Sequence, residues 1–265
     1  MKVSVIMPAF NAEKYIGEAI KSVLDQSHRD IELLIINDGS TDDTASKIDQ
    51  FDDERIQVFH QENSGVSAAR NLGLDTMSGE FFCFLDADDK LPLDSIQTRL
   101  EKFLTNPDLD FVDGTVLKSN KSLSRTLSRW EPGFRGEPLN DLLSLSGNTF
   151  FGPTWLIKRD VNIQYKFKIG LTHGEDLLFY ISICNGKNYD YVLEPILNYR
   201  IHSQSAMQDL KKLGEGYETI YHSLDEFSFI SIQGKKRFRK KYRSIMLKSY
   251  LRNGHILETL KLIFK

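Results

Sequence analysis

The chain reads Phe81-Phe82-Cys83-Phe84-Leu85 and continues directly into Asp86-Ala87-Asp88-Asp89. The first five residues form an apolar run of the length of a buried strand, so the acidic turn is expected at that strand's carboxyl end. Asp86 and Asp88, two residues apart, can converge on one hard cation and leave it open positions for phosphate. The alternative is a solvated acidic turn that caps the next helix.

Apolar runs and amphipathic segments alternate through the first hundred residues. Strands are expected at 3–7, 31–36, 56–60 and 81–85, and helices are expected after Asn11 as a cap, from Thr41 or Asp42 toward Phe51, and over 64–77. This rhythm is typical of βαβ units around a mostly parallel sheet. Ligands of such sheets bind outside the carboxyl ends of the strands, where Asn37-Asp38-Gly39-Ser40 also falls.

The second half of the chain has a weaker pattern. A strand is expected at 111–117, a loop or lid at 118–148, a core segment at 150–157, a helix at 176–184, a strand at 189–193 and helices over 210–264. Trp155 near a strand end is expected in the core rather than stacked on a ligand, and Lys158 and Arg159 are expected to pair with nearby acids.

Composition indicates a globular chain, because 40% of its 265 residues are hydrophobic and 27% are charged. Cys83 and Cys184 offer neither zinc spacing nor a disulfide framework, which fits a reducing, cytoplasmic setting. The apolar run 3–7 is too short for a signal peptide, and no window reaches the roughly 18 apolar residues of a membrane span. The chain is therefore expected to begin inside its fold.

Charge is distributed unevenly along the chain. Residues 235–265 contain eleven basic residues and one acidic residue, a net charge of +10. The whole chain has a net charge of −3, so residues 1–234 have a net charge of −13. The two parts are expected to face different partners.

Several other site types do not fit the acidic turn. An EF-hand needs glycine where Leu91 stands, and a haloacid-dehalogenase-type phosphatase needs a small or branched residue where Lys90 stands. The first strand is followed by neither a dinucleotide fingerprint nor a Walker loop, which argues against a Rossmann dehydrogenase or a P-loop kinase.

Four stretches in this order and spacing resemble the inverting family 2 glycosyltransferases of bacterial polysaccharide synthesis. They run from Val3 to Asn11, from Asn37 to Asp42, from Asn63 to Asn71 and from Phe84 to Asp89, and the similarity continues through Gly174-Glu175-Asp176 to Tyr199-Arg200-Ile201-His202. The resemblance implies an α/β GT-A fold over 1–207, with a mostly parallel central sheet flanked by helices. Residues 208–265 lie outside the resemblance and are expected to form a helical, basic C-terminal extension.

The resemblance also assigns residues to the donor. Pro8, Ala9 and Phe10 correspond to the wall beside the base and ribose, Asp38 to the aspartate that reads the base, and Arg70 to the basic residue near the phosphates. Asp86 and Asp88 match the Asp-x-Asp motif that reaches the ribose and a Mn²⁺ or Mg²⁺ ion, with His202 as a further metal ligand or phosphate contact. Because Asp38 can accept a pyrimidine N3–H, the expected donor is a UDP-sugar, although thymidine shares that group.

Asp176, with Glu175 beside it, corresponds to the catalytic base of the family. An inverting transfer needs one carboxylate to take the acceptor proton, and a neighbouring acid raises the pKa of that carboxylate. Helix capping is the alternative role for this pair. A sugar-nucleotide pyrophosphorylase and an inactive nucleotide-sugar binder are the rival functions.

The acceptor is expected to be a glycan or lipid-linked hydroxyl. Basic residues in 235–265 interleave with an apolar stripe that includes Phe238, Tyr242 and Met246, so the segment is expected to lie on an anionic bilayer at the inner face of the plasma membrane. A helix packed on the domain with a solvated basic face is the alternative. A nucleic-acid partner is not expected, since residues 1–234, with a net charge of −13, would repel it.

Overall fold

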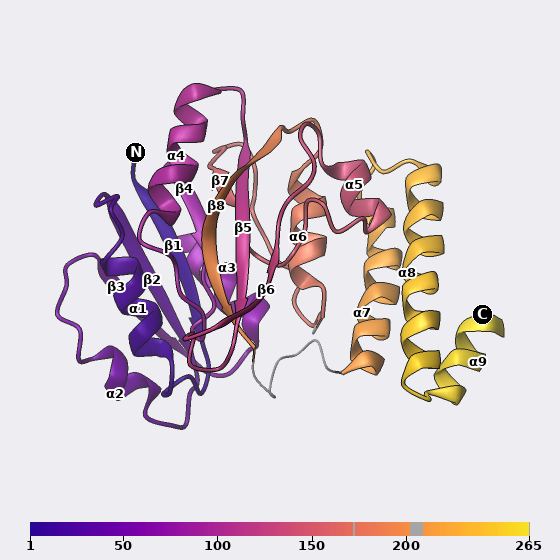
Figure 1. The fold of residues 1–265 in the computed structure, drawn as a ribbon, viewed down its shortest axis with the longest axis horizontal. Coiled ribbons are helices and arrows are strands. Elements are labelled where there is room, and N and C mark those ends of the chain that lie inside the picture. The colour runs from indigo at the N-terminus through magenta and orange to yellow at the C-terminus, as the bar shows by residue number, and fades with distance from the viewer. Residues whose placement is uncertain (172, 202–208, 265) are drawn as a thin grey trace.

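The computed structural model describes residues 1–171, 173–201 and 209–264. These residues form an eight-stranded mixed sheet in the order β3-β2-β1-β4-β7-β5-β6, with β8 also paired to β5 (Figure 1). β1, β2, β3 and β4 are parallel, and β7 runs antiparallel between β4 and β5. β8 runs parallel to β5, and β6 runs antiparallel to it.

The first half of the chain alternates strands and helices as the sequence predicts. The elements are β1 (Val3–Ala9), α1 (Ile16–Leu24), β2 (Ile31–Asp38), α2 (Thr44–Ile48), β3 (Ile56–Gln61), α3 (Val66–Thr76), β4 (Phe81–Phe84) and α4 (Ser95–Thr105). The expectation for Asn11 is wrong. Helix α1 begins at Ile16 with Tyr15 at its N-cap, and the Asn11 side chain instead accepts the Thr41 N–H at 2.8 Å.

Two hydrophobic layers cover the two faces of the sheet. Alternate residues of a strand point to opposite faces, so Leu33 and Ile35 pack with α1, whereas Leu34 and Ile36 pack in the layer that contains α3 and α6. Both faces of β1 and β2 are buried, which explains their nearly continuous apolar sequences. The central strands are therefore fixed in register, and their carboxyl ends meet at one edge.

The second half departs from the prediction in three places. Its elements are β5 (Phe111–Ser119), β6 (Thr126–Trp130), α5 (Leu139–Ser144), β7 (Leu156–Lys158), α6 (Glu175–Ile183) and β8 (Tyr189–Arg200). The expected loop at 118–148 contains β6 and α5, and the segment expected at 150–157 is a strand only from Leu156. Strand β8 continues to Arg200, because irregularities in its pairing with β5 accommodate Pro195.

Three helices complete the described chain, namely α7 (Leu210–Ser223), α8 (Ile232–Arg252) and α9 (Ile256–Phe264), with a short 3-10 turn at Leu224–Glu226. Figure 1 shows them at the end of the molecule opposite β3. In α8, buried side chains recur every four residues and join the same core as α6: Phe238, Tyr242, Met246 and Tyr250. These residues were expected to form a bilayer-facing stripe, and that expectation is wrong because α5 and α7 cover them.

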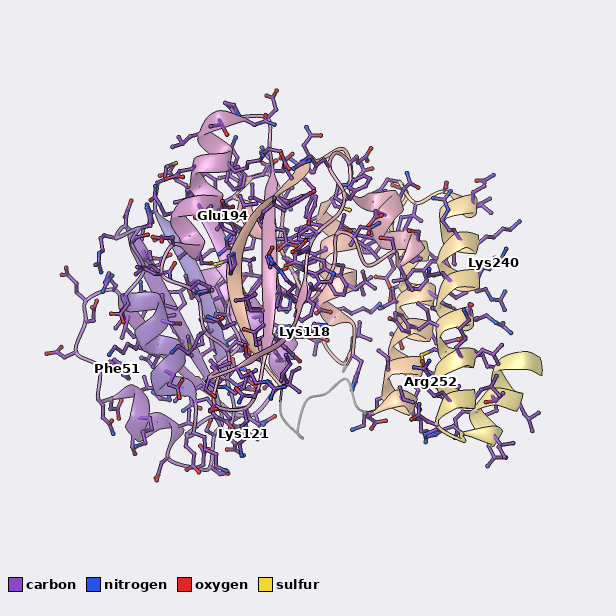
Figure 2. The ribbon with its side chains drawn as sticks, in the orientation of Figure 1. Phe51, Lys118, Lys121, Glu194, Lys240 and Arg252 are labelled. Carbon is purple, nitrogen blue, oxygen red and sulfur yellow. The ribbon has the colours of Figure 1, made fainter. Side chains whose placement is uncertain are left out.

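The outer side of α8 carries the positive charge. Lys240 points away from the sheet in Figure 2. Among the described residues, no helix combines the length and apolarity needed to cross a membrane.

Candidate functional site

The loops that follow β1 and β2 are joined at the carboxyl edge of the sheet. Ala9 pairs with Asn37 in the strand register, and the Asn11 N–H donates to Ser40 Oγ at 3.0 Å. Pro8 and Ala9 are buried, whereas half of Phe10 is exposed beyond the end of β1. The Phe10 ring is therefore the part of this predicted wall that a ligand can reach.

Asp38 lies at the end of β2 and is only 3% exposed. Its Oδ1 accepts the Gln61 amide at 2.6 Å and the Ser64 N–H at 2.8 Å, and its Oδ2 accepts the Gly65 N–H at 2.8 Å. A carboxylate offers about four acceptor positions. Asp38 thus holds the loop before α3 and keeps capacity for one further donor.

The acidic turn follows β4. The Asp89 N–H donates to the Asp86 carbonyl at 3.0 Å, and 38% of the Asp86 side chain is exposed. Asp89 points inward and accepts the Arg200 N–H at 2.7 Å. Burial raises the pKa of Asp89 well above its ordinary value, and the charges of Asp88 and Asp86 add to this effect.

Arg200 holds this turn from the end of β8. Its side chain is 1% exposed, and Nε donates to the Asp88 carbonyl at 2.6 Å. The guanidinium also donates to the Lys121 carbonyl and to Glu18 and lies 4.2 Å from the centre of the Tyr15 ring. The role of Arg200 is not visible in the sequence, because only the pairing of β8 with β5 brings this residue to the acidic turn.

Arg70 on α3 connects the acidic turn to the acidic pair. One terminal nitrogen lies 2.9 Å from Asp86 Oδ1 and the other 2.9 Å from Glu175 Oε1. The Arg70 side chain is 3% exposed, and its guanidinium packs over the neighbouring rings of Phe84 and Phe167, 5.8 and 5.3 Å from their centres. Burial alone would lower the pKa of Arg70, but the surrounding carboxylates raise it above its ordinary value. Arg70 is therefore a fixed positive charge between the two clusters.

Glu175 and Asp176 form the first turn of α6. Burial, followed by the charge of Glu175, raises the pKa of Asp176 from 3.8 to about 7, and Arg70 opposes this increase. Asp176 Oδ1 accepts the Leu177 N–H at 2.8 Å, while Glu175 is paired with Arg70. Within this pair, Asp176 has the pKa suited to taking a proton at neutral pH.

Helix α7 supports the start of α6. Gly174, the N-cap of α6, has a φ of +78°, and a Cβ atom there would lie 2.8 Å from Ile220 Cδ1. A Cβ atom at Gly216 would lie 2.3 Å from the His173 carbonyl oxygen. Because both glycines allow α7 to approach the acidic pair closely, the C-terminal helices help to position it.

The residues available to a divalent cation are oxygen donors. Among residues 1–171, 173–201 and 209–264, no group of three or more His, Cys, Asp and Glu side chains is arranged to hold a metal ion. Asp86 and Asp88, both half-buried on this turn, fit Mg²⁺ or Mn²⁺, which is commonly held by one or two carboxylates together with substrate phosphates. His202 lies outside the described residues.

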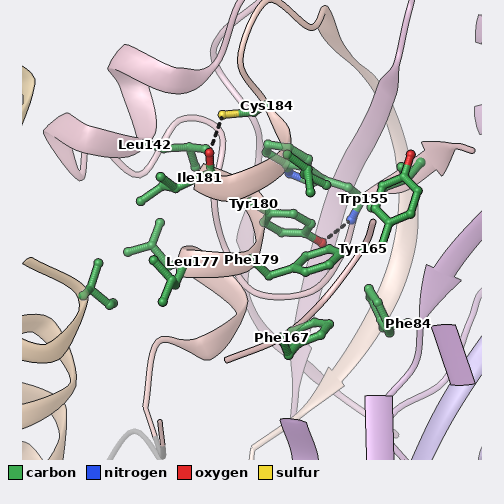
Figure 3. Close-up of a cluster of buried hydrophobic side chains, with 14 of the residues drawn as sticks. Phe84, Leu142, Trp155, Tyr165, Phe167, Leu177, Phe179, Tyr180, Ile181 and Cys184 are labelled. Atoms are coloured by element: carbon green, nitrogen blue, oxygen red, sulfur yellow. Dashed lines mark hydrogen bonds between the residues drawn. The ribbon is translucent and has the colours of Figure 1, made fainter. Parts of the chain in front are cut away.

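Two secondary expectations have clear outcomes. Trp155 is fully buried and stacks on Tyr180 at 4.0 Å, so its assignment to the core is confirmed (Figure 3). Lys158 and Arg159 donate to the backbone carbonyls of Pro107 and Met77 rather than to acids, so that pairing expectation is wrong.

The sequence of this chain is similar to a family model and to several curated proteins. Residues 4–166 match the model of glycosyl transferase family 2. The putative teichuronic acid biosynthesis glycosyltransferase TuaG of Bacillus subtilis is 46% identical over 241 residues, which cover 86% of this chain and 90% of TuaG. An uncharacterized glycosyltransferase of Rickettsia felis is 33% identical over 204 residues, or 76% of this chain, but the match covers only 33% of that protein. The chain thus spans a third or less of the length of several curated relatives.

Solved structures share the fold at low sequence identity. Staphylococcus aureus TarS 1-349 in complex with UDP-GlcNAc has a TM-score of 0.73 and 19% identity, covering 92% of this chain and 72% of that one. The mannosyltransferase PcManGT of Pyrobaculum calidifontis, in complex with GDP-Man and Mn²⁺, has a TM-score of 0.66 and 14% identity, covering 99% and 80%. The predicted GT-A fold with a C-terminal helical region is confirmed.

Proposed function

The chain belongs to glycosyl transferase family 2, and we propose that it transfers a sugar from a nucleotide diphosphate donor to a hydroxyl group with inversion at the anomeric carbon. The observation that carries the proposal is Arg70, which lies 2.9 Å from both Asp86 and Glu175. This residue brings the donor-binding turn and the acidic pair to one place. The proposed arrangement covers 1–207, with 208–265 as an extension that packs against it.

The donor lies along the carboxyl edge of β1 and β2. Pro8, Ala9 and the exposed Phe10 ring flank the base and ribose, and the remaining acceptor position on Asp38 takes the N3–H of uracil. A UDP-sugar is the proposed donor, and the complex of TarS with UDP-GlcNAc is consistent with this choice. Asp86 reaches the ribose side of the nucleotide.

Asp86 and Asp88 would hold the divalent cation, with His202 as a further candidate. Bound Mn²⁺ or Mg²⁺ would neutralise the diphosphate leaving group. Arg70 contributes a second positive charge beside the same phosphates and fixes the orientation of Asp86. Arg200 keeps the turn in place through the Asp88 carbonyl and the Asp89 side chain.

Asp176 acts as the general base. As the acceptor oxygen attacks the anomeric carbon, the bond from that carbon to the diphosphate breaks and the acceptor proton passes to Asp176. Glu175 stays paired with Arg70, and its negative charge contributes to the raised pKa of Asp176. One carboxylate therefore takes the proton and its neighbour adjusts the pKa, with no covalent intermediate.

The acceptor is a glycan or lipid-linked hydroxyl, and the proposed docking partner is an anionic membrane surface. Over residues 256–262 of helix α9, three apolar side chains are exposed, namely Ile256 at 70%, Leu257 at 69% and Leu260 at 44%. The neighbouring outer side of α8 is basic, and each basic residue near an anionic surface contributes about 1 kcal/mol before screening. The apolar contact is thus assigned to α9 rather than to α8.

Calorimetric titration of UDP, GDP and CDP, each with and without Mn²⁺, tests the donor assignment. We expect UDP to bind most tightly and Mn²⁺ to strengthen its binding. Tighter binding of GDP or CDP would contradict the role of Asp38. Absence of binding by all three would contradict the function, and binding without sugar transfer or hydrolysis would indicate an inactive binder.

A further inference from the structure

Three aromatic side chains from separate elements meet around Phe151. Trp130 ends β6, Phe151 follows α5, and Tyr199 lies in β8. The Trp130 and Phe151 ring centres are 5.6 Å apart, and Tyr199 meets Phe151 edge to face at 5.2 Å. Lys118 of β5 places its Nζ 4.8 Å from the centre of the Phe151 ring. We call Trp130, Phe151 and Tyr199 the aromatic platform.

The platform is only half-buried, unlike the aromatic core behind it. Trp130, Phe151 and Tyr199 all retain accessible surface, whereas Trp155 and Tyr180 are fully buried. The indole N–H of Trp130 donates to the Gly147 carbonyl at 2.8 Å, which fixes the ring plane. Lys118 pairs with Tyr199 in the strand register, so the platform rests on the rigid sheet.

The segment that carries Phe151 is fastened to α6. The Tyr180 hydroxyl accepts the Trp155 N–H at 3.1 Å, and the Trp155 indole donates to the Thr149 carbonyl at 2.9 Å. Figure 3 shows the Tyr180 to Trp155 hydrogen bond within this core. Next to Phe151, a Cβ atom at Gly152 would lie 3.9 Å from Asp176 Oδ2. The platform is therefore held at a fixed position beside the proposed base.

We propose that the aromatic platform is an acceptor subsite that stacks on the pyranose ring of the acceptor sugar, an inference that rests on the proposed function for the identity of the base. A pyranose has an apolar C–H face, and half-buried aromatic rings provide a flat apolar surface with low conformational entropy cost. Stacking there leaves the ring hydroxyls of the sugar at the edge of the platform, toward Asp176. Lys118 is placed to donate to a sugar oxygen at the rim.

Binding of methyl glycosides tests the subsite without knowledge of the natural acceptor. The probes are the methyl β-glycosides of glucose, galactose, N-acetylglucosamine and N-acetylgalactosamine. The chain has two tryptophans and Trp155 is fully buried, so a fluorescence change on titration reports mainly on Trp130. We expect at least one glycoside to change the fluorescence, and Phe151→Leu to weaken its binding about tenfold, the effect of losing roughly 1.4 kcal/mol of aromatic stacking.

Phe227→Leu is the matched control, because Phe227 is also half-buried and packs on another aromatic residue, Phe229, at 5.6 Å. The control should bind the glycoside as the wild type does. Trp130→Leu on the exposed edge strand β6, followed by saturation-transfer NMR, replaces Phe151→Leu if that variant does not fold. The proposal is overturned if none of the four glycosides binds, or if both platform variants bind as tightly as the control.

Nucleotide release from UDP-sugars without an acceptor separates this inference from the proposed function. Phe151→Leu should release nucleotide at the wild-type rate, because the proposed donor residues come from β1, β2 and β4 and none belongs to the platform. If the wild type binds glycosides but neither binds nor cleaves any donor, the proposed function fails and the sugar site stands. If donor cleavage is normal and the platform variants leave glycoside binding unchanged, the subsite alone fails.

Discussion

Replacing Arg70 with methionine should destabilise the fold by leaving a carboxylate uncompensated. Glu175 is 13% exposed, so loss of its partner leaves a largely buried charge, whereas Asp86 at 38% exposure can be rehydrated. Breaking a buried ion pair from one side costs about 3–5 kcal/mol, and the exposed Asp86 pair adds less than about 1 kcal/mol. At roughly 2–4 °C per kcal/mol for a chain of this size, Tm should fall by about 10 °C.

A double-mutant cycle tests the cause of this loss. Combining Arg70→Met with Glu175→Gln removes the stranded charge, so we expect the double variant to recover about 1–3 kcal/mol relative to the sum of the single effects. The assay is thermal and urea unfolding followed by circular dichroism. A Tm within about 2 °C of wild type for Arg70→Met, or strict additivity in the cycle, would refute the reasoning.

Three further predictions concern the reaction and the membrane. Asp176→Asn should keep donor affinity while kcat falls by about 10² to 10⁴. Wild-type kcat should rise with pH through about 7, because the base acts in its deprotonated form and its pKa is about 7, and a flat pH profile of kcat from pH 5 to 9 would contradict this role. Excess chelator or Asp88→Asn should abolish turnover with little change in Tm, since Asp88 is only half-buried and asparagine keeps its size and shape. Full activity in chelator would exclude a metal role. Leu257→Asp on α9 should abolish salt-sensitive co-sedimentation with anionic vesicles, whereas Leu104→Asp, a similarly exposed control on α4, should not. Equal vesicle binding by the two variants would show that α9 does not contact the membrane.

The sequence predicts the first half of the fold well because β1, β2 and β4 are buried on both faces. Leu33 to Ile36 form a continuous apolar run that only a central strand explains. Strand β6 (Thr126–Trp130) is not predicted, because this edge strand is almost entirely exposed and its sequence does not alternate apolar and polar residues. The long β8 escapes prediction because Pro195 interrupts its pattern, and the compensating irregularity lies in its pairing with β5.

Some site residues can be predicted from a local sequence motif, whereas others come together only through long-range packing. The motif around Asp86 and Asp88 is a property of one turn, so its spacing is visible in the sequence. The contact of Arg70 with Glu175 joins residues 105 positions apart and depends on how α3 and α6 pack on one face of the sheet. The basic tail shows the limit of helical periodicity, since a stripe such as Phe238 to Met246 fits a bilayer and a protein core equally well.

Release of nucleotide diphosphate from a panel of UDP-, GDP- and TDP-sugars in the presence of Mn²⁺ tests the central claim most directly. The wild-type chain should release UDP from at least one UDP-sugar, with water in place of the acceptor, and Asp176→Asn should retain the donor but release nucleotide about 10² to 10⁴ times more slowly. If the wild type cleaves none of these donors, or if Asp176→Asn cleaves its donor at the wild-type rate, the assignment of this site to glycosyl transfer with Asp176 as the base is contradicted.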